Sequence, residues 1–198
     1  MPQYFDNDPA LASAKKLVFY RINDIDFALY TDNGVFSKEG LDYGSRTLIN
    51  TVIKEGFAGP VLDLGCGWGA IGVTLARLYQ EINFELVDVN ERALELAKIN
   101  AEKYELSNLS IYSSDGASAV KGKMKTILTN PPIRAGKEVV YRFFTESYNV
   151  LDEQGTLFVV IRKAQGAPSA VKKLTEIFGN CIIIEKNKGY FILKSIKK

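Results

Sequence analysis

Asp63-Leu64-Gly65-Cys66-Gly67-Trp68-Gly69 decides the fold of this chain, because it joins a strand predicted at residues 61–64 to a helix predicted at residues 70–78. Glycines at such a junction let the backbone turn sharply and come close to a ligand, which meets the free amides at the start of the helix. The stretch therefore predicts a ligand site at the end of the first strand of a parallel sheet.

Strand-like and helix-like runs alternate after this loop. We predict further strands at residues 84–87, 109–112, 126–129 and 156–161, and a closing hairpin at 182–185 and 190–193. Helices are predicted from a cap at Asn90 to about Tyr104, across residues 139–151 and at 170–178. This alternation is typical of βαβ units. It predicts an α/β fold with a Rossmann-like, doubly wound, mainly parallel seven-stranded sheet and an antiparallel C-terminal strand.

Two apolar runs precede this core, at residues 17–22 and 25–30, and they flank the turn residues Asn23 and Asp24. The pattern predicts an N-terminal β-hairpin. Leu48, Ile49, Val52 and Ile53 then share one face of a predicted helix. We predict a single domain over residues 1–198, with a hairpin extension at 1–40 and the Rossmann-like core at 41–198.

The composition, 46% hydrophobic and 24% charged, is that of a globular protein. No apolar run approaches the ~20 residues that span a membrane, and Asp6 and Asp8 near the start argue against a secretory signal. Two cysteines, Cys66 and Cys181, make no disulfide framework, which fits a reducing compartment, so we expect a cytoplasmic protein. We expect no membrane partner; the sequence leaves the oligomeric state open, and a monomer is the expectation. The sequence has no histidine, which excludes histidine bases and ligands; we predict no metal site.

Charge is distributed unevenly along the chain. Residues 1–100 hold 9 Lys/Arg and 14 Asp/Glu, a balance of −5, whereas residues 101–198 hold 16 and 9, a balance of +7. The asymmetry suggests a polyanionic partner for the C-terminal half, although solvated surface lysines would give the same balance.

Asp88 ends the second predicted strand, where its carboxylate can accept hydrogen bonds from ribose hydroxyls. Gly67-x-Gly69-x-x-Gly72 with Asp88 also fits a dinucleotide fingerprint. Two features oppose that interpretation: the turn begins at Gly65, which puts Gly72 inside the helix, and Asp63 would repel a pyrophosphate. A carboxylate at Asp63 suits either an amino-acid ammonium or a structural contact to the loop amides.

Asp115 follows the third predicted strand, where it can receive an adenine amino group, with Gly116 leaving room for the ring. By itself it is equally well a loop aspartate. Cys66 is interpreted as a small buried side chain without a redox task.

Asn130-Pro131-Pro132-Ile133 follows the fourth predicted strand. Asn-Pro often marks a simple turn, but each proline also holds the residue before it in an extended conformation. Oxygens of such a segment are fixed in space. Two fixed oxygens that accept the hydrogens of a conjugated amine can bend its nitrogen towards tetrahedral and stabilise the charge that develops on attack. We therefore predict that Asn130, Pro131 and Pro132 are catalytic, in a reaction where alignment does most of the remaining work.

Two further stretches, residues 34–37 (Gly-Val-Phe-Ser) and 41–45 (Leu-Asp-Tyr-Gly-Ser), together with the glycine loop and Asn130-Pro-Pro, resemble the small-subunit ribosomal RNA guanine-N2 methyltransferase family. Residues 130–137 and 165–170 are similar to those of its compact bacterial members, and the resemblance covers about residues 17–196. It implies a class I S-adenosylmethionine-dependent methyltransferase whose partner is ribosomal RNA or the small ribosomal subunit.

The resemblance implies amine activation at Asn130 and Pro131, and a segment at residues 44–46 near the cofactor. The predicted cofactor-binding residues are Asp63, Gly65, Cys66, Gly67, Asp88, Val89, Asp115, Gly116 and Asn130. The predicted substrate-binding residues are Phe36, Ile133, Arg134, Lys137, Arg162 and Lys163. The basic ones are expected to contact phosphates.

The chain departs from the family in two ways. Longer members carry an extra N-terminal methyltransferase-like domain, and the residue after the prolines is usually an aromatic that stacks on the base, whereas here it is Ile133. Phe36 or Tyr43 could stack instead. Adenine-N6 and protein-glutamine methylation use the same Asn-Pro-Pro chemistry, so both remain alternatives. A non-catalytic cofactor-binding module associated with RNA is a third, which the intact Asn130-Pro-Pro opposes.

Overall fold

A seven-stranded sheet forms the centre of the protein in the computed structural model, which describes residues 13–198. Its strands are β3 (Val61–Leu64), β4 (Phe84–Asp88), β5 (Leu109–Ser113), β6 (Met124–Thr129), β7 (Leu151–Arg162), β8 (Ile182–Asn187) and β9 (Tyr190–Ile196), in the spatial order β5-β4-β3-β6-β7-β9-β8. The first five are mutually parallel, and β9 runs antiparallel to both its neighbours, β7 and β8. The predicted sheet with its antiparallel C-terminal strand is confirmed.

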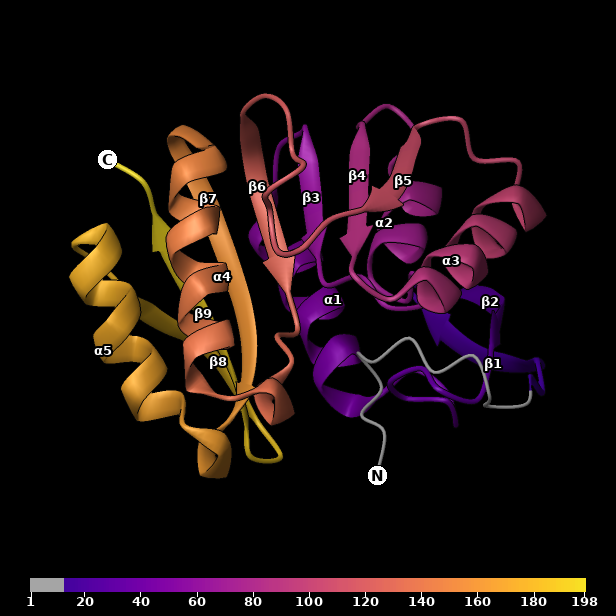
Figure 1. The fold of residues 1–198 in the computed structure, drawn as a ribbon, viewed down its shortest axis with the longest axis horizontal. Coiled ribbons are helices and arrows are strands. Elements are labelled where there is room, and N and C mark those ends of the chain that lie inside the picture. The colour runs from indigo at the N-terminus through magenta and orange to yellow at the C-terminus, as the bar shows by residue number, and fades with distance from the viewer. Residues whose placement is uncertain (1–12) are drawn as a thin grey trace.

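Helices cover both faces of the sheet (Figure 1). One face carries α1 (Tyr43–Glu55), α2 (Gly72–Leu78) and α3 (Glu91–Lys103), and the other carries α4 (Lys137–Val150) and α5 (Ala167–Phe178). Alternate residues of one strand face opposite layers. In β3, Val61 belongs to the core under α1–α3, whereas Leu62 belongs to the core under α4 and α5. The sheet is therefore doubly wound, as predicted.

The N-terminal hairpin is a separate two-stranded sheet of β1 (Lys16–Ile22) and β2 (Ile25–Thr31). Asn23 and Asp24 form its turn with φ values of 46° and 59°, the left-handed conformation that two-residue hairpin turns require. Hydrogen bonds from Asn100 and Tyr104 tie β2 to the end of α3. The predicted hairpin is confirmed; Asp6 and Asp8 lie outside the described residues.

Several predicted boundaries are wrong, among them the start of α5, which is Ala167 and not residue 170. The helix expected from Ala70 begins at Gly72, because the amide of Gly72 donates to the Asp63 carboxylate (2.8 Å) and residues 67–71 form turns instead. Gly72 is thus the first residue of α2, inside the helix as predicted. The fifth strand is also longer than expected. It begins at Leu151, directly after the last residue of α4. Leu151 was predicted as the end of the helix but is the first residue of the strand.

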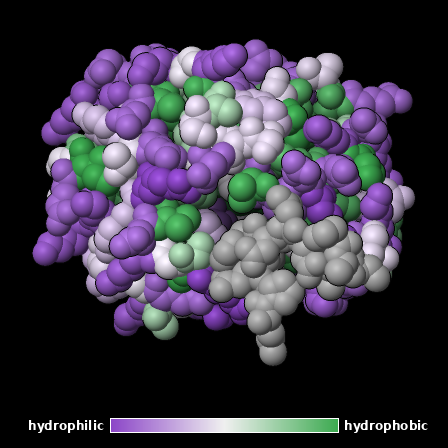
Figure 2. Space-filling model, in the orientation of Figure 1, coloured by the Kyte–Doolittle hydropathy of each residue, from purple (hydrophilic) through white to green (hydrophobic). Residues whose placement is uncertain are grey.

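On the face shown in Figure 2, hydrophilic residues cover most of the surface and hydrophobic ones form small separate groups. The large apolar side chains lie mainly in the two core clusters, in line with ordinary globular packing. Within residues 13–198, no helix is both long and apolar enough to cross a membrane.

The carboxyl ends of the five parallel strands meet at one edge of the sheet. The residues at or just after the ends of these strands include Gly65, Asp88, Asp115, Asn130 and Lys163. Ligand sites of open α/β sheets form at this edge.

Candidate functional site

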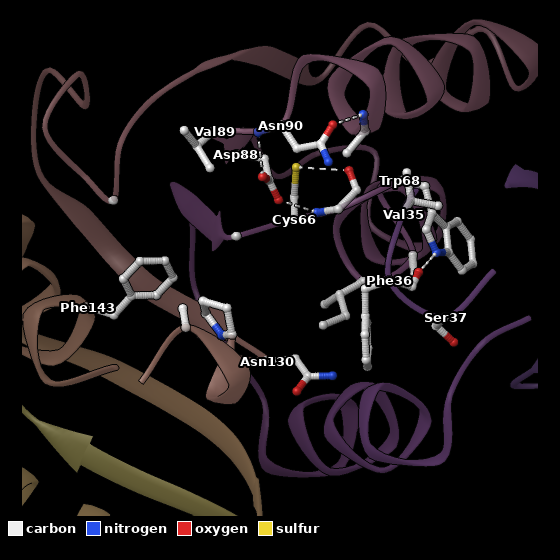
Figure 3. Close-up of a pocket in the computed structure, with 18 of the residues that line it drawn as sticks. Val35, Phe36, Ser37, Cys66, Trp68, Asp88, Val89, Asn90, Asn130 and Phe143 are labelled. Atoms are coloured by element: carbon white, nitrogen blue, oxygen red, sulfur yellow. Dashed lines mark hydrogen bonds between the residues drawn. The ribbon is translucent and has the colours of Figure 1, made fainter. Parts of the chain in front are cut away.

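A cavity of about 270 Å³ opens at this edge, beside the glycine loop. We call it the first cavity. Figure 3 shows Asp88 and Asn130 on opposite sides of it, above and below in this view, with Phe143 on the left and Phe36 on the right. Its lining comes from the loop after β3, the ends of β4, β5 and β6, the loop before α1 and the start of α4, and includes Phe36, Asp42, Ser45, Gly65, Cys66, Gly67, Asp88, Val89, Asp115, Gly116, Asn130, Pro132, Arg142 and Phe143.

The Asp88 carboxylate is fixed by backbone amides at the end of β4. Its Oδ2 accepts from the Gly67 amide (2.8 Å) and its Oδ1 from the Asn90 amide (2.9 Å). Burial raises the pKa of Asp88. A carboxylate has about four lone-pair sites, so this rigid group at the cavity wall keeps the capacity to accept a hydrogen bond from a hydroxyl group of a ligand.

Gly67 lets the loop backbone form the wall of the first cavity. Its φ of 55° lies in the left-handed region, and a Cβ placed on it would meet no atom within 4 Å. A side chain there would be strained and would stand in open space beside the cavity lining. A ligand can therefore approach the main chain at this point.

Asp63 lies behind the first cavity and does not line it. The side chain is fully buried, and Oδ2 accepts from the Gly72 amide. Burial raises the pKa of Asp63 from 3.8 to about 7. Of the two roles that the sequence left open, the geometry matches the structural contact to the loop and not a direct contact to a ligand ammonium.

Asp115 is held by an arginine that the sequence did not indicate. Both of its oxygens accept from the Arg142 guanidinium (2.8 and 2.5 Å), and this pairing lowers the pKa of Asp115. The adjacent Gly116 has a φ of 60°, in the left-handed region that favours glycine, and a Cβ there would meet the Glu146 carboxylate. Glu146 also accepts from the Ala117 amide (2.7 Å). Gly116 lines the first cavity, and room there for an adenine ring stays a prediction.

Asn130 lies at the end of β6, and a partner far away in the chain fixes its amide. Its Nδ2 donates to the Ser45 hydroxyl oxygen (3.0 Å). Ser45 is buried near the start of α1, where its own amide donates to the capping carboxylate of Asp42 (3.0 Å). No residue within 13–198 donates to Asn130 Oδ1, so the side chain presents a fixed acceptor oxygen.

The two prolines separate the first cavity from a second. Pro132 lines the first cavity and Pro131 the second. The Pro132 carbonyl accepts from the Ala135 amide (2.9 Å) in the short 3-10 turn Ile133–Ala135. The Pro131 carbonyl receives no hydrogen bond from the described part of the chain. It is therefore a second acceptor oxygen, adjacent to Asn130.

The second cavity measures about 190 Å³ and shares Phe36, Asp42 and Asn130 with the first. Its other lining residues are Pro131, Ile133, Arg134, Val160, Ile161, Arg162, Gln165 and Tyr190. The structure thus gathers four predicted substrate residues here: Phe36, Ile133, Arg134 and Arg162. Lys137 and Lys163 line neither cavity.

Sequence reasoning missed several residues of the site. Ser45 lay within a quoted stretch, but its pairing with Asn130 joins residues 85 positions apart. Trp68 anchors the loop of Phe36 through a hydrogen bond from Nε1 to the Phe36 carbonyl (2.9 Å). Tyr190 carried no signal beyond its place in the closing hairpin. Tyr43 lines neither cavity, because it packs against Tyr190, so of the two suggested rings only Phe36 lines a cavity.

Comparison with known proteins agrees with this geometry. The family model described as "Methyltransferase small domain" matches residues 26–194. A protein of Bacillus subtilis (strain 168), described as uncharacterized protein YbxB, is 44% identical over 196 residues, which is 98% of both chains.

Solved structures give the same fold. The T. thermophilus 16S rRNA N2 G1207 methyltransferase (RsmC), in complex with AdoMet and guanosine, superposes with a TM-score of 0.84 at 25% identity. That match covers 96% of this chain but only 52% of RsmC, so the chain spans about half the length of that relative. A methyltransferase from Pyrococcus furiosus superposes with a TM-score of 0.65 at 20% identity, over 77% of this chain and 82% of that one, and shows the fold alone. With its glycine loop, fixed Asp88 and matching family model, the chain belongs to the methyltransferase small domain family.

Proposed function

We propose that the protein transfers a methyl group from S-adenosylmethionine to the exocyclic N2 amine of a guanine in ribosomal RNA. The position of Asn130, between the two cavities, is the observation that carries the proposal. Asn130 lines both cavities, and Ser45 holds its amide so that Oδ1 is a fixed acceptor. The similarity to RsmC, which is described as a 16S rRNA N2 methyltransferase with AdoMet and guanosine bound, supports the choice of cofactor and base.

The first cavity fits the cofactor. Asp88 offers a half-buried carboxylate for the ribose hydroxyls, and Gly67 gives access to the main chain within the loop. Val89 and Phe143 supply apolar surface for an adenine ring. S-adenosylmethionine is the methyl donor, and its sulfonium makes the methyl group electrophilic without help from a metal or a histidine.

The protein's own contribution to the reaction is to activate the exocyclic amine of the target base. The lone pair of an exocyclic amine is conjugated with the base, which makes the nitrogen a poor nucleophile. Asn130 Oδ1 and the Pro131 carbonyl can accept its two hydrogens, which favours the tetrahedral geometry and stabilises the positive charge of attack. Because Ser45 and the prolines hold these oxygens in advance, little reorganisation is needed when the charge develops.

The charge distribution supports RNA as the substrate. Residues 101–198 have a balance of +7, and this half of the chain supplies Arg134, Lys137 and Lys163 near the ends of β6 and β7. Lysine and arginine contacts to phosphates release counterions, so RNA binding should weaken with salt, with a log–log slope of about −0.7 per phosphate contact.

Mass spectrometry of ribosomal RNA nucleosides, from cells with and without the protein, tests this function. We expect N2-methylguanosine to fall in cells that lack it and to return when the purified protein and S-adenosylmethionine are added to the extracted RNA. N6-methyladenosine as the product, or methylation of protein glutamine with no change in RNA, would contradict the proposal.

A further inference from the structure

The second cavity lies across Asn130 from the first. If the cofactor occupies the first cavity, the base whose amine reaches Asn130 must enter from the second. This inference rests on the proposed function. A base taken out of a stack needs a flat surface to replace its lost neighbours. Ile133, which lines the second cavity after the prolines, has no ring to offer.

Arg162 provides a planar group in this cavity. Its guanidinium carbon lies 4.9 Å from the centroid of the Tyr190 ring. The two residues are direct cross-strand partners on β7 and β9, so the sheet register holds them opposite each other. Both line the second cavity.

The Tyr190 ring is itself fixed from the side of α1. A Cβ placed on Gly44 would come within 2.7 Å of Tyr190 Cε1, so the backbone of α1 packs directly against the ring. Tyr43 adds a second ring, with its centroid 5.9 Å away. Tyr190 thus has little freedom to turn, and it restrains the plane of the guanidinium beside it.

The positive charge of Arg162 is not neutralised within the described part of the chain. None of the ion pairs there includes Arg162, and its side chain makes no hydrogen bond to residues 13–198. Guanidinium planes stack on nucleobases, and a lysine ammonium does not share that geometry.

We propose that Arg162, held by Tyr190, is the stacking platform for the target base in the second cavity, and that it replaces the aromatic residue that Ile133 lacks. This differs from the phosphate contact expected from its charge alone. Lys163, the next residue, lines neither cavity and keeps the role of a phosphate contact.

Arg162→Lys and Arg162→Ala separate the two roles, because lysine keeps the charge and loses the plane. The probe is ribosomal RNA from cells without the protein, and the readouts are kcat/KM and the dependence of RNA affinity on salt. A stacking platform predicts that both variants lose about 5- to 150-fold in kcat/KM, the equivalent of ~1–3 kcal/mol of base stacking, with an unchanged salt slope. Tyr190→Leu should reproduce the loss, and Tyr190→Phe should restore the activity because the ring remains.

A phosphate contact gives the opposite pattern. Arg162→Lys would then keep nearly full kcat/KM, and Arg162→Ala would lower the salt slope by about 0.7. Lys163→Ala is the matched control for that slope change. The modified nucleoside is identified in the same reactions. If the wild type makes a nucleoside other than N2-methylguanosine, the proposed function fails while the stacking comparison still holds on that RNA. If no RNA is methylated, both fail. N2-methylguanosine together with a fully active Arg162→Lys overturns the stacking role alone.

Discussion

The two cavities that meet at Asn130 are built in different ways. The first is formed largely by the ends of neighbouring strands, where the backbone amides of Gly67 in the glycine loop and of Asn90 after β4 hold the half-buried Asp88 carboxylate. The second is assembled from side chains of four separate segments, and four of its members are exposed: Phe36, Arg134, Arg162 and Gln165. The difference indicates a division of tasks. A rigid backbone site suits a cofactor that is the same in every turnover, and the side chains of the second cavity suit a particular substrate.

Asn130→Ala should give the largest effect, because it removes an acceptor that acts as charge develops on the amine. We expect kcat to fall about 10²–10³-fold, as for loss of one oxyanion-type contact. Steady-state kinetics with ribosomal RNA measure it. A comparable loss of cofactor affinity would show that the two cavities are not separate in function.

Asp88→Ala should give the next largest effect, in the first cavity. Loss of a charge-assisted contact to ribose should weaken cofactor binding by roughly 1.5–3 kcal/mol, about 10- to 150-fold. Calorimetry with S-adenosylmethionine measures the change, with NAD as the control ligand that should not bind. Unchanged affinity would remove Asp88 from the cofactor site.

Ser45→Ala tests whether Asn130 depends on its long-range partner, the Ser45 hydroxyl. Without the hydroxyl, the Asn130 amide can rotate, and we expect kcat to fall about five- to tenfold, the worth of one ordinary hydrogen bond. The same substitution made in the Asn130→Ala background should have almost no effect, since the pair then no longer exists. Additive losses would show that Ser45 acts on something other than Asn130.

Asp63→Asn should change stability with pH and leave cofactor affinity nearly unaltered. The folded-state pKa, about 7, lies above the ordinary 3.8, so the folded state favours the protonated carboxyl. The contribution of Asp63 is therefore full below about pH 4, and the free energy of unfolding falls as pH rises towards 7. Asparagine has no proton to lose, so the free energy of unfolding of the Asp63→Asn variant should fall less steeply with pH than that of the wild type. The pKa of Asp88 is also raised, so Asp88 contributes in the same direction and some decline should remain in the variant. Urea unfolding of both proteins between about pH 4 and 7 measures this difference. Identical slopes of unfolding free energy against pH would refute the raised pKa of Asp63.

The difference between the two cavities also explains how much of the site could be predicted from the sequence. The glycine loop and Asp88 belong to adjacent strands with regular patterns, so the fold and the first cavity followed from local rules. Asp63 and Gly116 were found, but their structural partners, Gly72 and Glu146, were not. Arg142 and Tyr190 come from a helix face and a hairpin, where nothing local distinguishes a site residue from an ordinary one. Their roles depend on packing between distant segments, which periodicity and spacing do not encode.

The division of tasks between the cavities is tested most directly by measuring two quantities on the same two variants. These are the dissociation constant for S-adenosylmethionine and the single-turnover rate of methyl transfer to ribosomal RNA at saturating cofactor, for Asn130→Ala and Asp88→Ala. The structure predicts that Asn130→Ala loses about 10²–10³ in rate with near-normal cofactor affinity, and that Asp88→Ala loses affinity while keeping most of its rate. An Asn130→Ala variant that turns over at a near-normal rate would contradict the mechanism and reduce Asn-Pro-Pro to a turn.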